Sequence, residues 1–231
     1  MRSMWRTLDR ESRRGIAAII AASFVSGLSF GAIAVASGMA LWVPLVMSAL
    51  VFAGGSQFLA VGLVAAGGNP VAAVAAGLVL NARHLPFGLA VGHLLGDRLA
   101  ARLLGSHLMV DESVAFALAQ RDPDRARAAF WACGAGLFAG WNLGGLLGAL
   151  AGQLIADPGA LGLDAVFPAL LLALVIPAMT GPDKWRPALV GAVIALATTP
   201  LLPAGVPVLL ALLGLVAVPR RRPATPDEVP A

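Results

Sequence analysis

The sequence is short of charge. Only 12% of its 231 residues are Asp, Glu, Lys or Arg, against roughly 25% in an average soluble domain. Hydrophobic residues make up 59% of the chain, and its mean hydropathy is +0.86. Because the apolar residues run continuously instead of alternating, the sequence predicts an all-α, polytopic membrane helix bundle and excludes both a soluble domain and a β-barrel.

Other residue types are missing or rare. The chain has no tyrosine and one cysteine, Cys133, so it cannot form an internal disulfide, and this thiol lies in an apolar run without a redox role. No metal-binding cluster, phosphate loop or nucleotide motif is found. The sequence therefore predicts no enzyme, no metal and no cofactor.

The charges that are present lie at the ends of apolar segments. A net charge of +4 would suit nucleic acid, but short arginine clusters beside apolar runs favour a lipid bilayer and exclude nucleic acid as the partner. The positive-inside rule predicts a cytoplasmic N-terminal tail (1–14), a cytoplasmic loop (97–128) and a cytoplasmic C-terminal tail (220–231). Residues 15–219 are then one multi-pass domain in a bacterial plasma membrane. A secretory signal is disfavoured, because everything downstream is membrane.

Several apolar units follow one another along the chain, and two of them look broken. The expected units are 16–37, 45–66, 71–95, 129–156, 165–181 and two short crossings within 187–219. Gly54-Gly55 and the stretch from Asn81 to Pro86 carry turn signals. Pro86 lacks a backbone donor, so carbonyls near residue 82 are expected to be free.

Parity constrains how the first units cross. If residues 1–14 and 97–128 are both cytoplasmic, the chain between them must cross an even number of times, yet it holds three units. Either a broken unit, 45–66 or 71–95, enters the membrane and returns on the same side, or the tract splits into four short spans. A re-entrant element is favoured, because irregular backbone survives in a membrane where it lines a cavity or is buried in protein.

Between Arg14 and Asp97 there is one charged residue, Arg83. A guanidinium at the bilayer centre costs about 2.5–3.5 kcal/mol on insertion scales, so this group should face protein, water or a substrate. It could recognise a carboxylate, or pair with an acid or with helix-end carbonyls. The adjacent His84 could carry protons or be a hydrogen-bonded helix-end residue. Asn81 belongs to the same predicted break.

Ser56 and Gln57 follow the glycine pair. Their donors and acceptors could bind an amino or carboxyl group, or satisfy the backbone of the break itself. Ser56 and His84 together also suggest an intramembrane serine protease, in which the histidine would activate the serine. No glycine follows the serine and no second motif supports that chemistry, so the protease interpretation is disfavoured.

Residues 129–156 carry glycines at a strict interval of four: Gly136, Gly140, Gly144, Gly148 and Gly152. This spacing predicts a face on which another helix packs closely. Asn142 lies in the same segment and, as a polar residue at mid-depth, needs a partner or has a functional role. Asp111 and Glu112 could pair with Arg83 or form a gate, although a solvated helix start is the simpler interpretation.

A family resemblance rests on a series of short motifs. They are Ser29-Phe30-Gly31, Met47-Ser48, Phe52-Ala53-Gly54, Gln57-Phe58, Asn81-Ala82-Arg83-His84 and Asp111-Glu112-Ser113. In this order they resemble the large subunit of the AzlC type of branched-chain amino acid permease, over residues from about 15 to 150. Pro86 stands where an aromatic residue would be expected nearby. The resemblance implies secondary export of branched-chain or similar apolar amino acids, with a small membrane partner of the AzlD type.

The combined hypothesis is a proton-gradient-driven exporter whose broken helices bind the charged ends of an apolar amino acid. Its aliphatic side chain would meet Phe52, Phe58, Leu80 and Phe87. The candidate substrate-binding residues are Ser56, Gln57, Asn81, Arg83, His84 and Asn142, with Asp111 and Glu112 for gating or charge pairing. Alternatives are a structural or regulatory membrane subunit without its own path, and an amino acid channel whose flux ignores the pH gradient.

Overall fold

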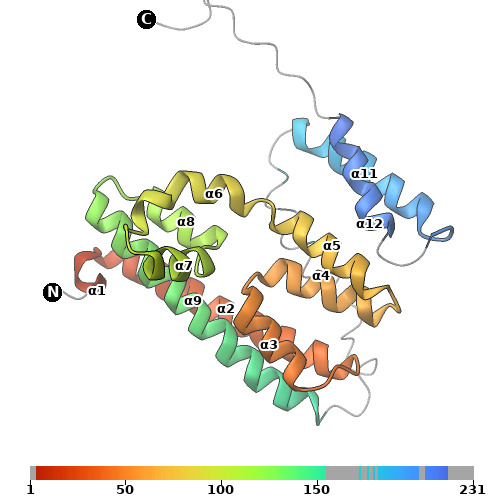
Figure 1. The fold of residues 1–231 in the computed structure, drawn as a ribbon, viewed down its shortest axis with the longest axis horizontal. Helices are drawn as coiled ribbons and strands as arrows, with labels where there is room; N and C mark the ends of the chain where they lie inside the picture. The colour runs from red at the N-terminus through yellow and green to blue at the C-terminus, as the bar shows by residue number, and fades with distance from the viewer. Residues whose placement is uncertain are drawn as a thin grey trace, which may run out of the picture.

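The computed structural model describes residues 4–154, 182–202 and 206–217, with the single residues 172, 176 and 179. Every element among them is helical, which confirms the all-α prediction (Figure 1). Within these residues three stretches are long and apolar enough to cross a membrane: Arg10–Ala36, Pro70–Leu94 and Pro123–Gly152. Most of the predicted unit 165–181 lies outside the described residues.

Helices α2 (Arg10–Ala36) and α9 (Pro123–Gly152) lie side by side and run diagonally through the lower part of the view in Figure 1. Asp9 caps α2 by accepting a hydrogen bond from the Ser12 backbone N–H at 2.7 Å, and the hydrogen bonds from Ser12 hold the pKa of Asp9 below its usual range. Helix α9 begins before the predicted residue 129, because Asp122 caps it and Pro123 suits its first position.

The glycine ladder of α9 is the seam between these two helices. Gly140, Gly144, Gly148 and Gly152 face the α2 backbone at Ile20, Phe24, Leu28 and Ala32, respectively. Both series of numbers rise together, so the helices run parallel. A Cβ built on Gly148 would collide with the Leu28 carbonyl. The predicted packing face is therefore confirmed, with backbone against backbone at the positions where side chains are absent.

The second apolar unit is a hairpin of two short helices, α3 (Trp42–Val51) and α4 (Gly54–Ala65). The Gln57 amide Nε2 donates to Ser48 Oγ at 3.1 Å, nine residues away. A straight helix would separate these residues by about 13.5 Å along its axis, beyond the reach of the two side chains. The chain must therefore reverse between them.

The reversal occurs at Phe52, whose φ of 41° is left-handed, and at Ala53. Gly54 and Gly55 begin α4 instead of forming the turn. At 10 and 12 residues, the two helices are about 15 and 18 Å long, roughly half of the 30 Å hydrocarbon thickness. The unit predicted at 45–66 thus enters the bundle and turns back, as the parity argument favours.

The third unit is also broken where expected. Helix α5 (Pro70–Asn81) ends at the turn Ala82–Arg83, and α6 (His84–Val91) continues into the 3-10 turn η1 (Gly92–Leu94). The expectation of free carbonyls is wrong: the Ala82 oxygen accepts from the Leu85 N–H at 3.1 Å. Pro86 lies in the first turn of α6, where its missing N–H would have no helical partner anyway.

The predicted loop 97–128 contains helices α7 (Leu99–His107) and α8 (Asp111–Leu118). Their junction is not a solvated connection, because Leu108 and Ser113 are buried and the Leu108 carbonyl lies against Gly134 of α9. The Ser113 hydroxyl accepts from the Val110 N–H at 3.0 Å and begins α8 inside the bundle. This packing carries Asp111 inward.

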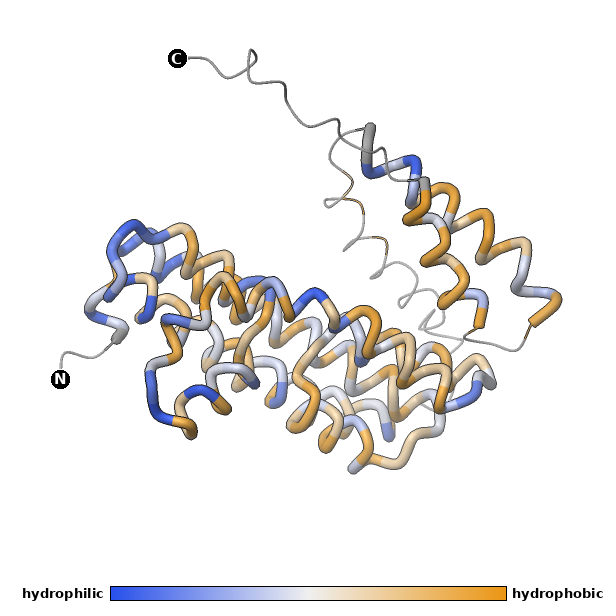
Figure 2. Tube along the Cα trace, turned by 45° about the horizontal axis from the view of Figure 1, so that its top comes forward, coloured by the Kyte–Doolittle hydropathy of each residue, from blue (hydrophilic) through white to orange (hydrophobic). Residues whose placement is uncertain are grey.

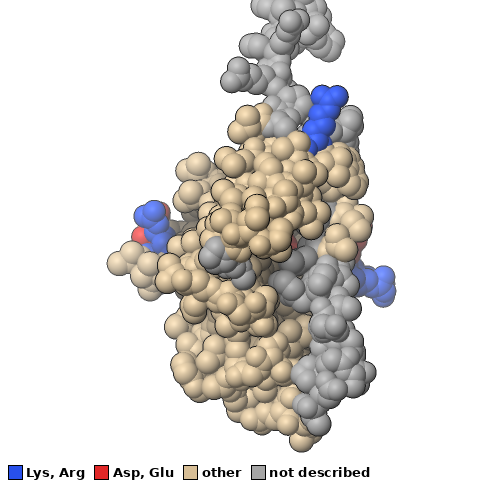
Figure 3. Space-filling view, turned by 90° about the vertical axis from the view of Figure 1, so that its right-hand side faces the viewer, with Lys and Arg blue, Asp and Glu red and all other residues tan. Residues whose placement is uncertain are grey.

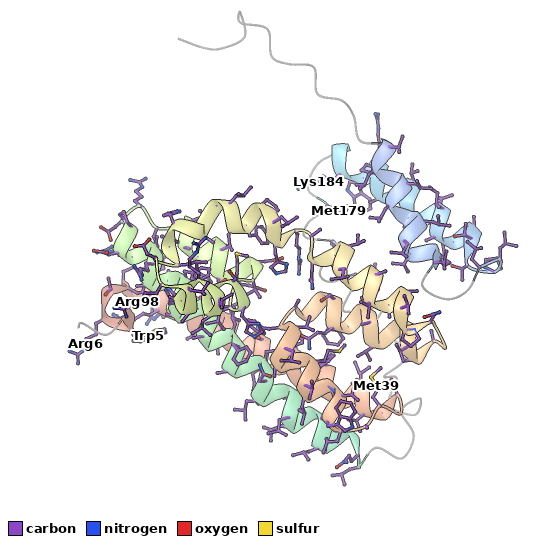
Figure 4. The ribbon with its side chains drawn as sticks, viewed as in Figure 1. Trp5, Arg6, Met39, Arg98, Met179 and Lys184 are labelled. Atoms are coloured by element: carbon purple, nitrogen blue, oxygen red, sulfur yellow. The ribbon has the colours of Figure 1, made fainter. Side chains whose placement is uncertain are left out.

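The N-terminal segment and the 97–128 region lie at one end of the bundle. Gln120 Nε2 donates to Ser12 Oγ at 3.2 Å, and helix α1 (Met4–Thr7) contacts α9. Trp5, Arg6 and Arg98 stand at this end and Met39 at the other (Figure 4). Figure 2 shows hydrophilic positions gathered at the same end. Accordingly, α2 runs away from this end of the bundle and α5–α6 runs back toward it. The remaining unit of the three, α3–α4, is the one that reverses.

The last described elements are α11 (Pro182–Thr198), α12 (Val206–Leu210) and the 3-10 segment η3 (Ala211–Ala217). Gly191 faces the Ala211 carbonyl and Gly214 faces the Pro187 carbonyl, so the two segments pack antiparallel. The sequence predicts two segments within 187–219, and the first of them, α11, begins earlier than expected, at Pro182. Viewed from the side of α4, α5, α11 and α12, the described surface is almost entirely uncharged (Figure 3).

Candidate functional site

The two helix breaks meet inside the bundle. A Cβ built on Gly55 would lie 3.9 Å from Arg83 Nη2 and 3.6 Å from the Leu80 side chain. One on Gly54 would meet the Trp141 ring at 2.9 Å. Trp141 in turn packs its backbone against Gly27 near the middle of α2. The N-terminus of α4 and the α5–α6 turn therefore share one place at about mid-depth of the α2–α9 pair.

Arg83 forms an ion pair at this place. Its Nη1 lies 2.8 Å from Asp111 Oδ2, and the two side chains are 38% and 46% exposed. The α7–α8 junction brings the carboxylate there. Asp111 is a partly exposed helix start, as expected, and it also forms the pair with Arg83 that the sequence left open. Glu112 is exposed and, in the described part of the chain, pairs with no cation. Of the two acids named from the sequence, the structure joins only Asp111 to Arg83.

Three polar atoms around the ion pair have no hydrogen-bond partner among the described residues. They are Asn81 Oδ1, Arg83 Nε and Asp111 Oδ1, all buried at the atomic level. Leaving such an atom unsatisfied costs about 1–3 kcal/mol. Two acceptors and one donor thus lack hydrogen-bond partners beside a cation and an anion. That set matches the ammonium and carboxylate groups of a zwitterion.

His84 is held in one tautomer by its neighbour. Its Nδ1 lies 2.9 Å from the Asn81 carbonyl oxygen, and a carbonyl can only accept, so Nδ1 carries the hydrogen. Nε2 is then the nitrogen of the neutral ring that can take up a proton. The ring packs edge-on against Phe87 with centroids 6.0 Å apart. His84 is therefore both a helix-end residue and a group with one nitrogen available for protonation.

Ser48, Gln57 and Trp141 form a buried polar group beside the α3–α4 break. Ser48 Oγ accepts from Gln57 Nε2 at 3.1 Å and from Trp141 Nε1 at 3.2 Å, and all three residues are at most 6% exposed. Gln57 Oε1 accepts from the Ala53 N–H at 3.2 Å. Of the two roles considered for Gln57, its recorded hydrogen bonds serve the break itself.

Ser56 acts in the same way, because its hydroxyl donates to the Ala53 carbonyl at 2.9 Å. Sequence reasoning missed Ser48 and Trp141 as members of this polar group. The signal for Ser48 was present: it is the only hydroxyl-bearing side chain in Trp42–Val51, where Trp42 is the other side chain with a polar hydrogen. Its partners were not readable, since Trp141 lies 93 positions away.

The apolar residues expected to receive a side chain divide into two sets. Phe58 and Phe52 are 2% and 5% exposed, and their rings pack against Phe30 at 5.5 Å and Phe138 at 5.1 Å. Both side chains therefore belong to the hydrophobic core. Leu80 and Phe87 are partly exposed and border the ion pair through Gly55 and His84. These two remain available to a ligand.

Asn142 stands apart from the other candidates. Its Nδ2 donates to the Phe138 carbonyl of its own helix at 2.9 Å. No recorded contact joins it to Arg83, Gln57 or His84. Trp141, one position earlier, packs against Gly54 at the α3–α4 break, where Phe138 packs against Phe52.

Comparison with known proteins identifies the family of this chain. Residues 18–155 match the family described as AzlC protein. The chain is 26% identical, over 208 residues, to the "Branched-chain amino acid transport protein AzlC" of Bacillus subtilis (strain 168), which covers 88% of this chain and 82% of that protein. No solved structure matches. The family match includes both helix breaks, the Arg83–Asp111 pair and all of α9, and the chain belongs to the AzlC family.

Proposed function

We propose that this chain is the transport subunit of a secondary transporter that exports branched-chain or similar apolar amino acids. The observation that carries the proposal is a set of buried atoms without hydrogen-bond partners, Asn81 Oδ1, Arg83 Nε and Asp111 Oδ1. They belong to an ion pair at the junction of two broken helices, the arrangement by which membrane transporters present backbone and charge to a substrate. The family match and the printed name of the Bacillus relative support transport.

The substrate carboxylate competes with Asp111 for Arg83. The guanidinium offers Nε, which has no partner, and Nη2, which lies toward Gly55 at the start of α4. The first N–H groups of a helix have no intrahelical acceptors and carry the positive end of the helix dipole. Gly54 and Gly55 have no side chains to shield those groups. A carboxylate between Arg83 and the α4 N-terminus would accept hydrogen bonds from the guanidinium and from the first N–H groups of the helix.

The substrate ammonium takes the acceptors that remain. Asn81 Oδ1 is open already, and Asp111 offers both oxygens once Arg83 turns to the substrate. One zwitterion therefore replaces one internal ion pair without leaving a charge unmatched, which limits the desolvation cost at mid-depth. Leu80 and Phe87 border the same place and would contact an aliphatic side chain.

Coupling to the proton gradient is assigned to His84. Its Nδ1–H is used by the Asn81 carbonyl, so a proton entering the site binds Nε2. A positive ring next to Arg83 disfavours a second cation there and weakens the hold on the substrate ammonium. The cytoplasmic N-terminus, the plasma membrane location and the small AzlD-type partner complete the proposal and follow from the charge pattern and the family resemblance.

Flux in liposomes tests this function. The purified chain is reconstituted in liposomes, alone and with a small AzlD-type partner. The liposomes are loaded with labelled leucine, and its release is followed with and without a pH gradient. The proposal expects release that grows with the gradient and is abolished by Asp111→Asn together with Arg83→Gln. Flux that ignores the gradient would indicate a channel. Flux by the complex that survives the double substitution would indicate that this chain is a structural or regulatory subunit.

A further inference from the structure

An open cavity of about 380 Å³ lies at the N-terminal end of α2, away from the helix breaks. It is lined by Trp5, Arg10, Arg13, Arg14 and Ala17. The four α2 residues follow the spacing i, i+3, i+4 and i+7, so they share one face of the helix. Trp5 of α1 lines the cavity with them. Of the residues that the structure describes, three arginines and one indole thus line the site and no acidic residue does.

Among the described residues, no carboxylate forms an ion pair with the arginines of this cavity. Arg13 Nε donates to the Asp9 backbone oxygen at 3.3 Å. A second cavity, of about 720 Å³, offers a contrast. It mixes arginines with Asp122 and Asp124. Only the first cavity has the charge balance that selects an anion.

Its depth relative to a bilayer follows from the length of α2. Residues 15–36 contain no charge and span about 33 Å as helix, close to the roughly 30 Å of the hydrocarbon core. Arg14 is therefore the first charged residue outside the core, at the level of the headgroups. Trp5 is exposed to 41% at the same end, and tryptophan is enriched at this depth.

We infer that the cavity binds the headgroup phosphate of an anionic phospholipid. Arginine presents forked donors that match phosphate oxygens in pairs, and three of them on one face can enclose one phosphate. The Trp5 indole would cover the glycerol and donate its N–H. A neutral phospholipid carries an ammonium group that compensates its phosphate, so the arginines bind its headgroup less strongly. The inference does not depend on the substrate site.

Native mass spectrometry of the full chain in neutral detergent tests the inference, with phosphatidylglycerol or phosphatidylcholine added. The variant Arg13→Gln/Arg14→Gln is compared with Arg98→Gln/Arg102→Gln, which removes the same charge from exposed positions in α7 and its start. We expect phosphatidylglycerol adducts on wild type and on the control, and roughly a tenfold or greater loss on the Arg13/Arg14 variant. Trp5→Leu keeps every charge and is expected to lose adducts as well. Circular dichroism verifies that each variant is folded.

Three results would overturn the inference. Equal loss of adducts in both double variants would mean attraction by net charge without a site. Equal retention of phosphatidylcholine would remove the role of the anionic headgroup. Displacement of phosphatidylglycerol by millimolar inorganic phosphate would assign the cavity to a free anion instead of a lipid.

Discussion

Gln57 reaches back across the α3–α4 break and donates from Nε2 to Ser48 Oγ at 3.1 Å. Its other amide atom, Oε1, accepts from the Ala53 N–H. One side chain therefore ties both arms of the turn, and it does so where Trp141 of α9 also donates to Ser48. These hydrogen bonds, together with the one from the Ser56 hydroxyl to the Ala53 carbonyl, hold the α3–α4 hairpin.

Replacing Gln57 by leucine should loosen this turn. The change leaves the buried Ala53 N–H without its acceptor, for which the expected cost is about 1–3 kcal/mol. Thermal unfolding of the purified protein in detergent measures the loss. Gln153→Leu, at an exposed position at the end of α9, is the matched control and should change little. Equal melting temperatures for the two variants would contradict a structural role for Gln57.

Gly148→Ala should separate α2 from α9. The added methyl group would meet the Leu28 backbone, which cannot rotate away as a side chain can, and overpacking of this kind costs about 1–3 kcal/mol. Gly92→Ala is the control, because a Cβ there meets nothing within 4 Å. Melting temperature and the monodisperse fraction on size exclusion report the difference. A Gly148→Ala protein as stable as Gly92→Ala would show that the seam tolerates side chains.

Phe52 gives a prediction about rank order. Its φ of 41° costs a non-glycine residue about 1–2 kcal/mol, whereas removing a buried phenylalanine ring costs about 3–5 kcal/mol. Phe52→Gly should therefore destabilise the protein, yet remain about 1 kcal/mol more stable than Phe52→Ala. Unfolding of the three proteins in detergent decides this. If Phe52→Ala is as stable as Phe52→Gly or more stable, residue 52 does not have the left-handed conformation.

Arg83→Lys should lower leucine flux by roughly tenfold or more, with a raised KM, because an ammonium cannot reproduce the forked donors of the guanidinium. Arg98→Lys, at an exposed position, is the control for expression and net charge. Counterflow of labelled leucine at matched protein levels is the measurement. Full activity of Arg83→Lys would remove the carboxylate-binding role.

His84→Asn separates hydrogen bonding from proton uptake. The asparagine amide can still donate to the Asn81 carbonyl, but it cannot be protonated. Leucine exchange without a pH gradient should persist, and gradient-driven transport should be lost. His93→Asn, at an exposed position, should behave like wild type. Gradient-driven transport that survives in His84→Asn would assign the proton to another group.

Much of the architecture could be read from the sequence because it depends on local composition. The apolar runs, the breaks near Gly54 and at Asn81–Pro86, and the glycine seam each follow from residues that are near neighbours or helically periodic. Arg83 was conspicuous for the same reason, as a lone charge in a long uncharged tract.

Only the tertiary structure decided what those features contact. The sequence marked a break after α3, but the left-handed Phe52 and the Ser48–Gln57 bond made it a reversal. The sequence indicated that Asp111 begins a helix, but only the packing of Leu108 against Gly134 brings that helix start to Arg83, 28 positions away. Periodicity reports which face of a helix is apolar, whereas pairing across the bundle depends on how whole helices pack, and no local pattern encodes that.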